Sequence, residues 1–187
     1  MSGHNTDGPG FLAHLTELGI STHKKTMALL GSGGAARAII SVLCLLPERP
    51  SQIRIFDIDQ GKTQQLLSDL KQRLDISIVK VVSSIADLKI QKADILINAT
   101  PVGMKESDPL LVDYKVFHKN MFVYDLIYNP SETKLLKEAK KQGAQTSNGL
   151  GLLYYQGVLS FEHWASAELD NTVKEKMRQS LIQRLAK

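Results

Sequence analysis

The sequence predicts an α/β fold: a doubly wound, mostly parallel sheet of six strands, with helices flanking it at the N- and C-terminal ends. Two observations predict this fold. Short apolar segments alternate along the chain with segments of helical periodicity, and the connections between them are short, as in successive βαβ units. The first apolar segment also runs directly into a cluster of glycines, as the first strand of such sheets often does.

The six strand candidates are short runs of apolar or β-branched residues. They cover residues 26–30, 52–56, 77–82, 93–98, 121–126 and 144–147. Helices are expected over residues 10–19, 35–46, 63–74, 131–142 and 150–187. In the third of these, Leu66, Leu70 and Leu74 recur at helical spacing, and Gly143 ends the fourth.

Composition excludes several classes of protein. A chain of 187 residues with 43% hydrophobic and 22% charged residues can bury a core, so one ordinary domain with terminal extensions is expected. The longest nearly apolar run, 39–46, is far shorter than the roughly 20 residues that span a bilayer. A net charge of +4 without a basic, aromatic-rich face argues against nucleic acid as a partner.

Cysteine and histidine usage bounds the chemistry. The single cysteine, Cys44, allows no disulfide within the chain and indicates a reducing, cytoplasmic location. The five histidines are scattered and share no spacing typical of metal ligands, so no metal site is expected.

The first strand candidate leads into Gly31-Ser32-Gly33-Gly34-Ala35, a variant of the dinucleotide-binding fingerprint. Glycines let the chain turn sharply off the strand and let the backbone approach a pyrophosphate, while the next helix presents its free N–H groups. A plain strand-to-helix turn is the alternative. Because the turn stands between a strand and a helix, we expect a Rossmann fold with cofactor contacts from these five residues.

Asp57 stands directly after the second strand candidate, 24 residues beyond Gly33. A carboxylate at this place accepts a hydrogen bond from the ribose 2′-hydroxyl of NAD and repels the 2′-phosphate of NADP. The sequence therefore predicts that NAD is preferred over NADP. The alternative for Asp57 and Asp59 is capping of the helix that follows, and one could cap while the other holds the ribose.

Five motifs, in order along the chain, carry a resemblance to a known family. They are Asn5-Thr6-Asp7, the glycine turn at 31–35, Asn98-Ala99-Thr100-Pro101-Val102-Gly103-Met104, Tyr124-Asp125-Leu126-Ile127-Tyr128-Asn129-Pro130, and Asn148-Gly149-Leu150-Gly151 followed by Gln156. From residue 3 to about residue 164, the sequence resembles the C-terminal, NAD(P)-binding portion of the shikimate dehydrogenase family, including its quinate/shikimate members. Glutamyl-tRNA reductase-like proteins share the glycine turn but fit the last motif less well.

The resemblance implies reversible hydride transfer between a nicotinamide cofactor and shikimate or quinate, in the chorismate pathway of aromatic amino acid biosynthesis. It implies that Asp7 is catalytic and binds substrate, and that Tyr128 and Gln156 also bind substrate. From the residues alone, Asp7 could instead cap a helix, Tyr128 could be an ordinary loop residue, and Gln156 an exposed helix residue.

The resemblance also implies contacts to the cofactor's ribose and nicotinamide from the carboxyl ends of later strands. The matching residues are Asn98, Thr100, Pro101, Gly103, Leu126 and Gly149. The alternative for the two glycines is a tight turn.

The chain departs from the family pattern in two ways. No lysine matches the family's catalytic lysine in a motif resembling Val-Thr-x-Pro-x-Lys, and most of the substrate domain, roughly a hundred residues, is not represented. The segment 57–59 replaces the Asn-Arg-Thr of NADP-using members, which also favours NAD. We therefore expect a linker and helix over residues 1–22, a Rossmann domain over 23–148 and C-terminal helices over 149–187.

Alone, such a chain is expected to be inactive or weakly active. The alternative is a non-catalytic NAD-binding module that needs a separate substrate-binding subunit. Apolar surface on the flanking helices predicts either a homodimer or a partner that takes the place of the missing domain.

Overall fold

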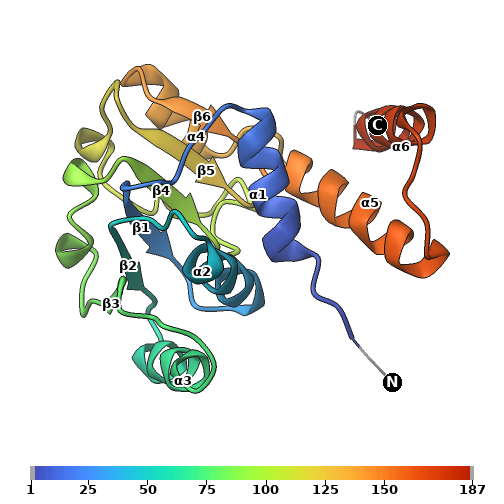
Figure 1. The fold of residues 1–187 in the computed structure, drawn as a ribbon. Helices are drawn as coiled ribbons and strands as arrows, with labels where there is room; N and C mark the ends of the chain where they lie inside the picture. Colours follow the sequence, from blue (N-terminus) through green and yellow to red (C-terminus); the bar gives the residue numbers. More distant parts are fainter. Residues whose placement is uncertain (1–2, 186–187) are drawn as a thin grey trace.

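The computed structural model describes residues 3–185, so the outermost positions of the first and last expected segments lie outside the described residues. Six strands form one sheet in the order β3-β2-β1-β4-β5-β6, with every neighbouring pair parallel (Figure 1). The strands are β1 (Thr26–Leu30), β2 (Gln52–Phe56), β3 (Val79–Val81), β4 (Ile95–Asn98), β5 (Phe122–Asp125) and β6 (Gln145–Ser147). The predicted doubly wound Rossmann sheet is confirmed, and it is parallel throughout.

Six α-helices and three short 3₁₀ turns complete the described chain. The helices are α1 (Asp7–Glu17), α2 (Gly34–Leu45), α3 (Gln60–Lys71), α4 (Lys134–Lys141), α5 (Leu150–Ala165) and α6 (Asn171–Leu185), and the turns are η1 (Ala86–Leu88), η2 (Ile90–Lys92) and η3 (Tyr114–Val116). Most predicted boundaries lie within three residues of the structure. Short strands and helices were recognisable because their apolar residues recur with the period of the element that buries them.

Two boundaries differ for identifiable reasons. Helix α1 starts at Asp7, three residues before the predicted start, because Pro9 falls in the first turn, where its missing N–H needs no partner. The segment predicted to be helical throughout from residue 150 onward is interrupted between two helices, α5 and α6. Ser166 adopts a left-handed conformation with φ 51° and ends α5.

Each face of the sheet has its own apolar layer. Helices α1, α2 and α3 cover one face, where residues such as Phe11, Leu43 and Leu66 pack on the strands. Helix α4 and the 3₁₀ turns cover the other face, through residues such as Leu88 and Leu135. The central strands β1 and β4 are buried from both sides, which explains their continuous apolar sequence.

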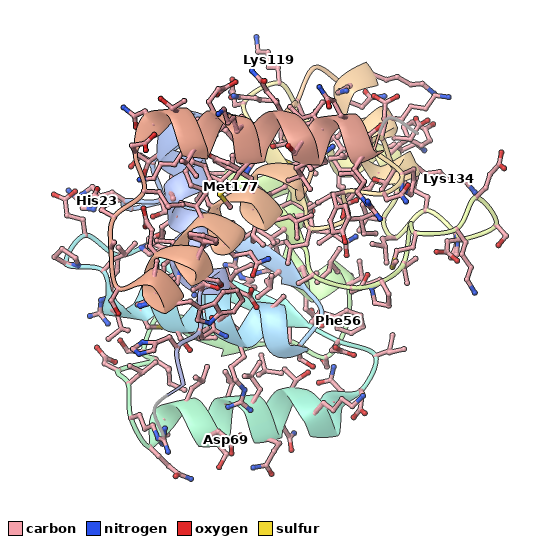
Figure 2. All side chains as sticks on the ribbon, turned by 90° about the vertical axis from the view of Figure 1, so that its right-hand side faces the viewer. His23, Phe56, Asp69, Lys119, Lys134 and Met177 are labelled. Carbon is pink, nitrogen blue, oxygen red and sulfur yellow. The ribbon has the colours of Figure 1, made fainter. Side chains whose placement is uncertain are left out.

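The C-terminal helices extend beside the sheet (Figure 1). Helix α5 crosses α1 so closely that a side chain at Gly10 would lie 2.9 Å from the backbone nitrogen of Gln156. Helix α6 lies over α5, with Met177 on the side that faces it (Figure 2). The Arg178 guanidinium stacks 4.3 Å from the centre of the Tyr154 ring. None of the helices within residues 3–185 combines the length and apolarity that crossing a membrane requires.

Candidate functional site

A groove of about 480 Å³ opens at the carboxyl ends of β1, β2 and β4. Its walls are the glycine turn after β1, the segment 57–59 with Lys62 after β2, and the segment 99–102 after β4. The strand order reverses between β1 and β4, and ligands of open parallel sheets bind in the crevice at such a switch point. The groove is therefore where a Rossmann sheet receives a dinucleotide.

The glycine turn is built for a close backbone approach. Gly31 has φ 97°, and a side chain there would lie 2.7 Å from the carbonyl oxygen of Ala99, so only glycine fits. Gly33 and Gly34, by contrast, face open space, because a Cβ at either position would meet nothing within 4 Å. Gly33 is the N-cap of α2 and provides no side-chain cap. The first turn of α2 thus begins beside open space, an open cradle in which its uncapped N–H groups could bind an anion such as a phosphate.

Asp57 braces this turn. Its Oδ2 accepts hydrogen bonds from the backbone nitrogen of Ser32 at 2.7 Å and from the Ser32 hydroxyl at 2.8 Å, and its Oδ1 accepts one from the Asp59 nitrogen. Burial raises the pKa of Asp57, but these hydrogen bonds outweigh it and leave the pKa below its ordinary value. Asp57 therefore stays ionised and links the end of β2 to the glycine turn.

Asp59 has the capping role that the sequence left open. It is the N-cap of α3, and its side chain accepts a hydrogen bond from the Lys62 nitrogen at 3.0 Å. The Lys62 ammonium lies 3.8 Å from the same carboxylate, in an exposed ion pair at the rim of the groove. This end of the groove therefore carries a cation as well as two carboxylates.

A buried polar cluster lies beneath the ends of β4 and β5. Asn98 Nδ2 donates to Asp125 Oδ1 at 2.9 Å, and the Thr133 hydroxyl donates to Asp125 Oδ2 at 2.6 Å. Asn98 Oδ1 accepts from the backbone nitrogen and the hydroxyl of Thr100 at 3.0 and 2.7 Å. Burial raises the pKa of Asp125, against the hydrogen bonds that lower it. The Asn98 side chain is thus committed to the protein itself and supports the groove from below.

The other predicted cofactor residues gather at the same edge of the sheet. A side chain at Gly149 would overlap the carbonyl group of Leu126, so the start of α5 lies directly on the end of β5. Gly103 abuts the Ile127 side chain, and exposed Pro101 lines the groove itself. The segments after β4, after β5 and before α5 thus meet at the carboxyl edge of the sheet, but Gly103, Leu126 and Gly149 do not line the groove.

The predicted substrate residues lie on neighbouring turns of α1 and α5, with one exception. Asp7 is the first residue of α1 and is not its cap, which is Thr6. No hydrogen bond engages its carboxylate within residues 3–185, so Asp7 is available to a ligand. The close approach of Gly10 to Gln156 puts the first turn of α1 beside the middle of α5. Tyr128 lies instead on the loop after β5 and is 38% exposed.

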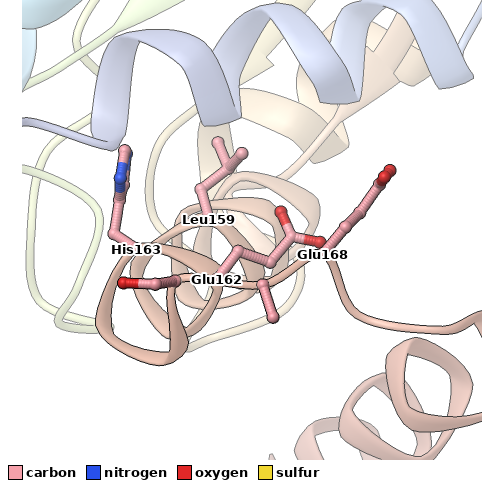
Figure 3. Close-up of a pocket in the computed structure, with 6 residues that line it drawn as sticks. Leu159, Glu162, His163 and Glu168 are labelled. Atoms are coloured by element: carbon pink, nitrogen blue, oxygen red, sulfur yellow. The ribbon is translucent and has the colours of Figure 1, made fainter.

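A second hollow, of about 350 Å³, lies at the far end of α5. Figure 3 shows His163 pointing from it toward α1, with Glu162 and Glu168 on its other side. It is wide open, and its polar groups do not converge on a common point. The described residues contain no group of three or more histidine, cysteine, aspartate or glutamate side chains that could hold a metal ion.

Sequence reasoning missed Asp125, Thr133 and Lys62 as components of the site. Asp125 ends a wholly buried strand, and a carboxylate at such a place is a signal that could have been used. Thr133 directly precedes α4, which indicates a cap but says nothing of Asp125. Lys62 lies in the first turn of α3, and its side chain lines the groove.

Comparison with known proteins places these features in a family. No family model matches the chain. A curated relative from Methanobrevibacter smithii, named shikimate dehydrogenase (NADP(+)), is 40% identical over 184 residues, which cover 94% of this chain and 63% of the relative. The chain spans less than two thirds of the length of the curated relatives it matches.

Solved structures agree with the curated relatives. Shikimate 5-dehydrogenase from Listeria monocytogenes, in complex with shikimate and NAD, matches with a TM-score of 0.84 and 31% identity, over 96% of this chain and 63% of that one. Quinate dehydrogenase from Corynebacterium glutamicum, in complex with NAD, matches with a TM-score of 0.85 and 28% identity, over 97% of this chain and 63% of that one.

The predicted preference for NAD over NADP is wrong. The curated relatives from Methanobrevibacter smithii, Methanopyrus kandleri and Methanocaldococcus jannaschii are all named for NADP(+). The prediction treated Asp57 as a free carboxylate that would meet the ribose. In the structure both of its oxygens bind the chain's own N–H and hydroxyl groups, and Lys62 adds a positive charge to the same wall. The charge pattern of the segment 57–59 therefore did not describe what a ligand would meet.

The sheet, the glycine turn and the similarity along nearly the whole chain lead to one assignment. Along nearly its whole length, the chain is similar to the NAD(P)-binding portion of the shikimate dehydrogenase family.

Proposed function

We propose that this chain binds a nicotinamide dinucleotide in the groove at the switch point, with the pyrophosphate on the first turn of α2. The observation that carries the proposal is the open cradle at Gly33 and Gly34, in front of helix N–H groups that no side chain caps. The adenosine half then lies toward the end of β2, and the nicotinamide half toward the ends of β4 and β5. NADP(+) is the form named for the curated relatives.

The chain serves an oxidoreductase that acts on shikimate or quinate, as the names of its relatives indicate. The bound dinucleotide accepts or supplies the hydride. Asp7 exchanges a proton with the substrate hydroxyl, and its position at the open start of α1, with no internal partner among the described residues, supports this role. Gln156 on the neighbouring helix, and Tyr128 on the loop after β5, orient the substrate through their polar ends.

Substrate binding also requires a further domain, in the same polypeptide or in another one. The relatives are longer than this chain, and no lysine here stands in the family's catalytic motif. The exposed aromatic side chains of Phe161 and Trp164, the latter 84% exposed, provide apolar surface on α5 for that domain or for a second copy of the chain. The enzyme works in the cytoplasm, which cell fractionation would test.

Calorimetric titration with NADP(+) and with NAD tests the cofactor proposal. Gly33 has an ordinary φ of −74°, so Gly33→Val should fold normally while its side chain enters the cradle, and binding should fall below detection. Gly157→Ala is the matched control, because a Cβ at Gly157 also meets nothing within 4 Å but lies on α5. If the unchanged chain binds neither dinucleotide, or if Gly33→Val binds as well as the control, the proposal fails.

Titration with shikimate and with quinate, at saturating dinucleotide, tests the substrate proposal separately. The chain alone should give little or no heat and no turnover. Adding the substrate-binding domain of a relative should restore both, and Asp7→Asn should then lose turnover while retaining dinucleotide binding. Full turnover by Asp7→Asn would exclude the proton-transfer role.

A further inference from the structure

The carboxylate of Asp125 is buried without a cation. Asp125 is the last residue of β5 and is 0% exposed. It receives hydrogen bonds from Asn98 Nδ2 at 2.9 Å, from the Ile127 nitrogen at 3.1 Å and from the Thr133 hydroxyl at 2.6 Å. Among residues 3–185, no lysine, arginine or histidine forms an ion pair with it. Burying an unpaired carboxylate costs a large desolvation free energy, so we expect Asp125 to do more than fill space.

The donors around Asp125 have fixed directions. Asn98 must turn its Nδ2 toward Asp125, because its Oδ1 already accepts the hydrogen bonds of Thr100. The Thr133 oxygen accepts a hydrogen bond from the Leu136 nitrogen at the start of α4, which leaves its proton for Asp125. Three donors therefore converge on one side chain that only accepts, as an ionised carboxylate does.

Each donor belongs to a different segment at the carboxyl ends of β4 and β5. Asn98 leads into the β4 loop at 99–104, whose Thr100, Pro101 and Val102 line the groove, and its Nδ2 also reaches the Val102 carbonyl at 3.3 Å. Ile127 belongs to the loop after β5, and Thr133 is the N-cap of α4. One carboxylate thus ties together the β4 loop, the loop after β5 and the start of α4.

We propose that Asp125 is a positioning residue of the dinucleotide site: its carboxylate holds the β4 and β5 loops, through Asn98, Ile127 and Thr133, in the arrangement that receives the nucleotide. Asp125 itself does not touch the ligand, because it is buried beneath the loops. If the site needed only stability at this position, an apolar side chain of similar volume would serve as well or better. The proposal rests on the proposed dinucleotide binding, and it adds which buried residue holds that site in shape.

Four variants of the chain test the proposal: Asp125→Asn, Thr133→Val, Thr133→Ser and Ile90→Val. Asp125→Asn removes the charge at constant shape, and Thr133→Val removes one donor. Thr133→Ser keeps the hydroxyl, so it is the rescue variant. Ile90→Val trims a buried side chain of η2, away from the groove, and is the control for lost stability alone.

Calorimetric Kd values for NADP(+) and NAD, the melting temperature and backbone amide spectra are measured for each variant. Asp125→Asn and Thr133→Val should weaken binding of both dinucleotides about tenfold, the effect of losing a hydrogen bond to a buried charge. Thr133→Ser should bind within about twofold of the unchanged chain. Ile90→Val should lower the melting temperature without changing Kd. In the free protein, amide resonances of Thr100 and Val102 should move in the first two variants and stay in place in the control.

Two results would overturn the proposal. One is unchanged Kd in both Asp125→Asn and Thr133→Val. The other is an equal loss in Ile90→Val at a similar melting temperature, because the cluster would then act through stability alone. If Asp125→Asn does not fold, the comparison of Kd between Thr133→Val and Thr133→Ser tests the proposal instead. If the unchanged chain binds no dinucleotide, the proposed function fails separately, and unmoved Thr100 and Val102 resonances in Thr133→Val would still refute the positioning role.

Discussion

Replacing Gly31 by alanine should destabilise the whole fold, and the size of the effect follows from two independent features. The residue has φ 97°, a conformation that costs an L-amino acid about 1–3 kcal/mol. A Cβ at this position would also lie 2.7 Å from the carbonyl oxygen of Ala99 and 2.9 Å from its carbonyl carbon. Both atoms are backbone at the end of β4, so relief requires strand movement, at a further cost of about 1–3 kcal/mol.

Together these features predict a loss of about 2–6 kcal/mol in the free energy of unfolding. For a chain of this size, that corresponds to a melting temperature lower by roughly 4–24 °C. Urea denaturation followed by far-ultraviolet circular dichroism measures the first quantity, and differential scanning calorimetry the second.

Gly33→Ala is the matched control, two residues along the same turn. Gly33 has a φ of −74°, and a Cβ there meets nothing within 4 Å. Alanine should therefore change stability by no more than about 1 kcal/mol, in the stabilising direction. If Gly31→Ala unfolds at the same urea concentration as the unchanged chain, or if the two variants behave alike, the account of the turn is refuted.

Three further predictions concern charged or titratable groups. Arg178→Ala removes the guanidinium that stacks on Tyr154 and pairs with Glu17, so hydrogen exchange in α6 should speed up by about tenfold; unchanged exchange would show that α6 is held by other contacts. Burial lowers the pKa of His14 below its ordinary 6.5, so the unfolded chain binds its proton more readily and stability should fall as the pH drops below about 6.5. Urea midpoints at pH 7.5 and 5.5 should therefore differ more for the unchanged chain than for His14→Gln, and equal differences would assign the effect to other groups. Asp57→Ala should weaken NADP(+) and NAD by similar factors, because Asp57 braces the glycine turn; a calorimetric loss confined to NAD would instead show a ribose contact.

The strands and the glycine turn could be predicted because their signals are local. Strand β1 and the turn that follows it occupy consecutive residues, and the apolar period of a strand is visible within five of them. The capping role of Asp59 was equally open to prediction, since a cap and the N–H that it accepts lie three residues apart. The start of α1 was placed late because Pro9 resembles a helix breaker unless its position within the first turn is known.

The prediction that depended on the charge of one side chain, the preference for NAD, was wrong. The carboxylate of Asp57 predicted a preference for NAD, yet one of its oxygens is bound by the nitrogen and hydroxyl of Ser32, 25 residues earlier in the glycine turn. The pairing exists because β1 and β2 are neighbours in the sheet. A carboxylate selects a ligand through the lone pairs that the protein leaves free, and the sequence does not record which are free.

The sequence by itself determined the class of fold, the order of its elements and the place of the glycine turn, because backbone conformation and apolar period are properties of adjacent residues. Only the tertiary structure decided how Asn98, Asp125 and Thr133 meet, how Gly10 sets α1 against α5, and which carboxylates remain available to a ligand. These relations depend on β4 lying beside β5 and on two helices crossing at a glycine. They join residues that are distant in the chain, and hydrogen bonds between such residues form only once the sheet has brought them together.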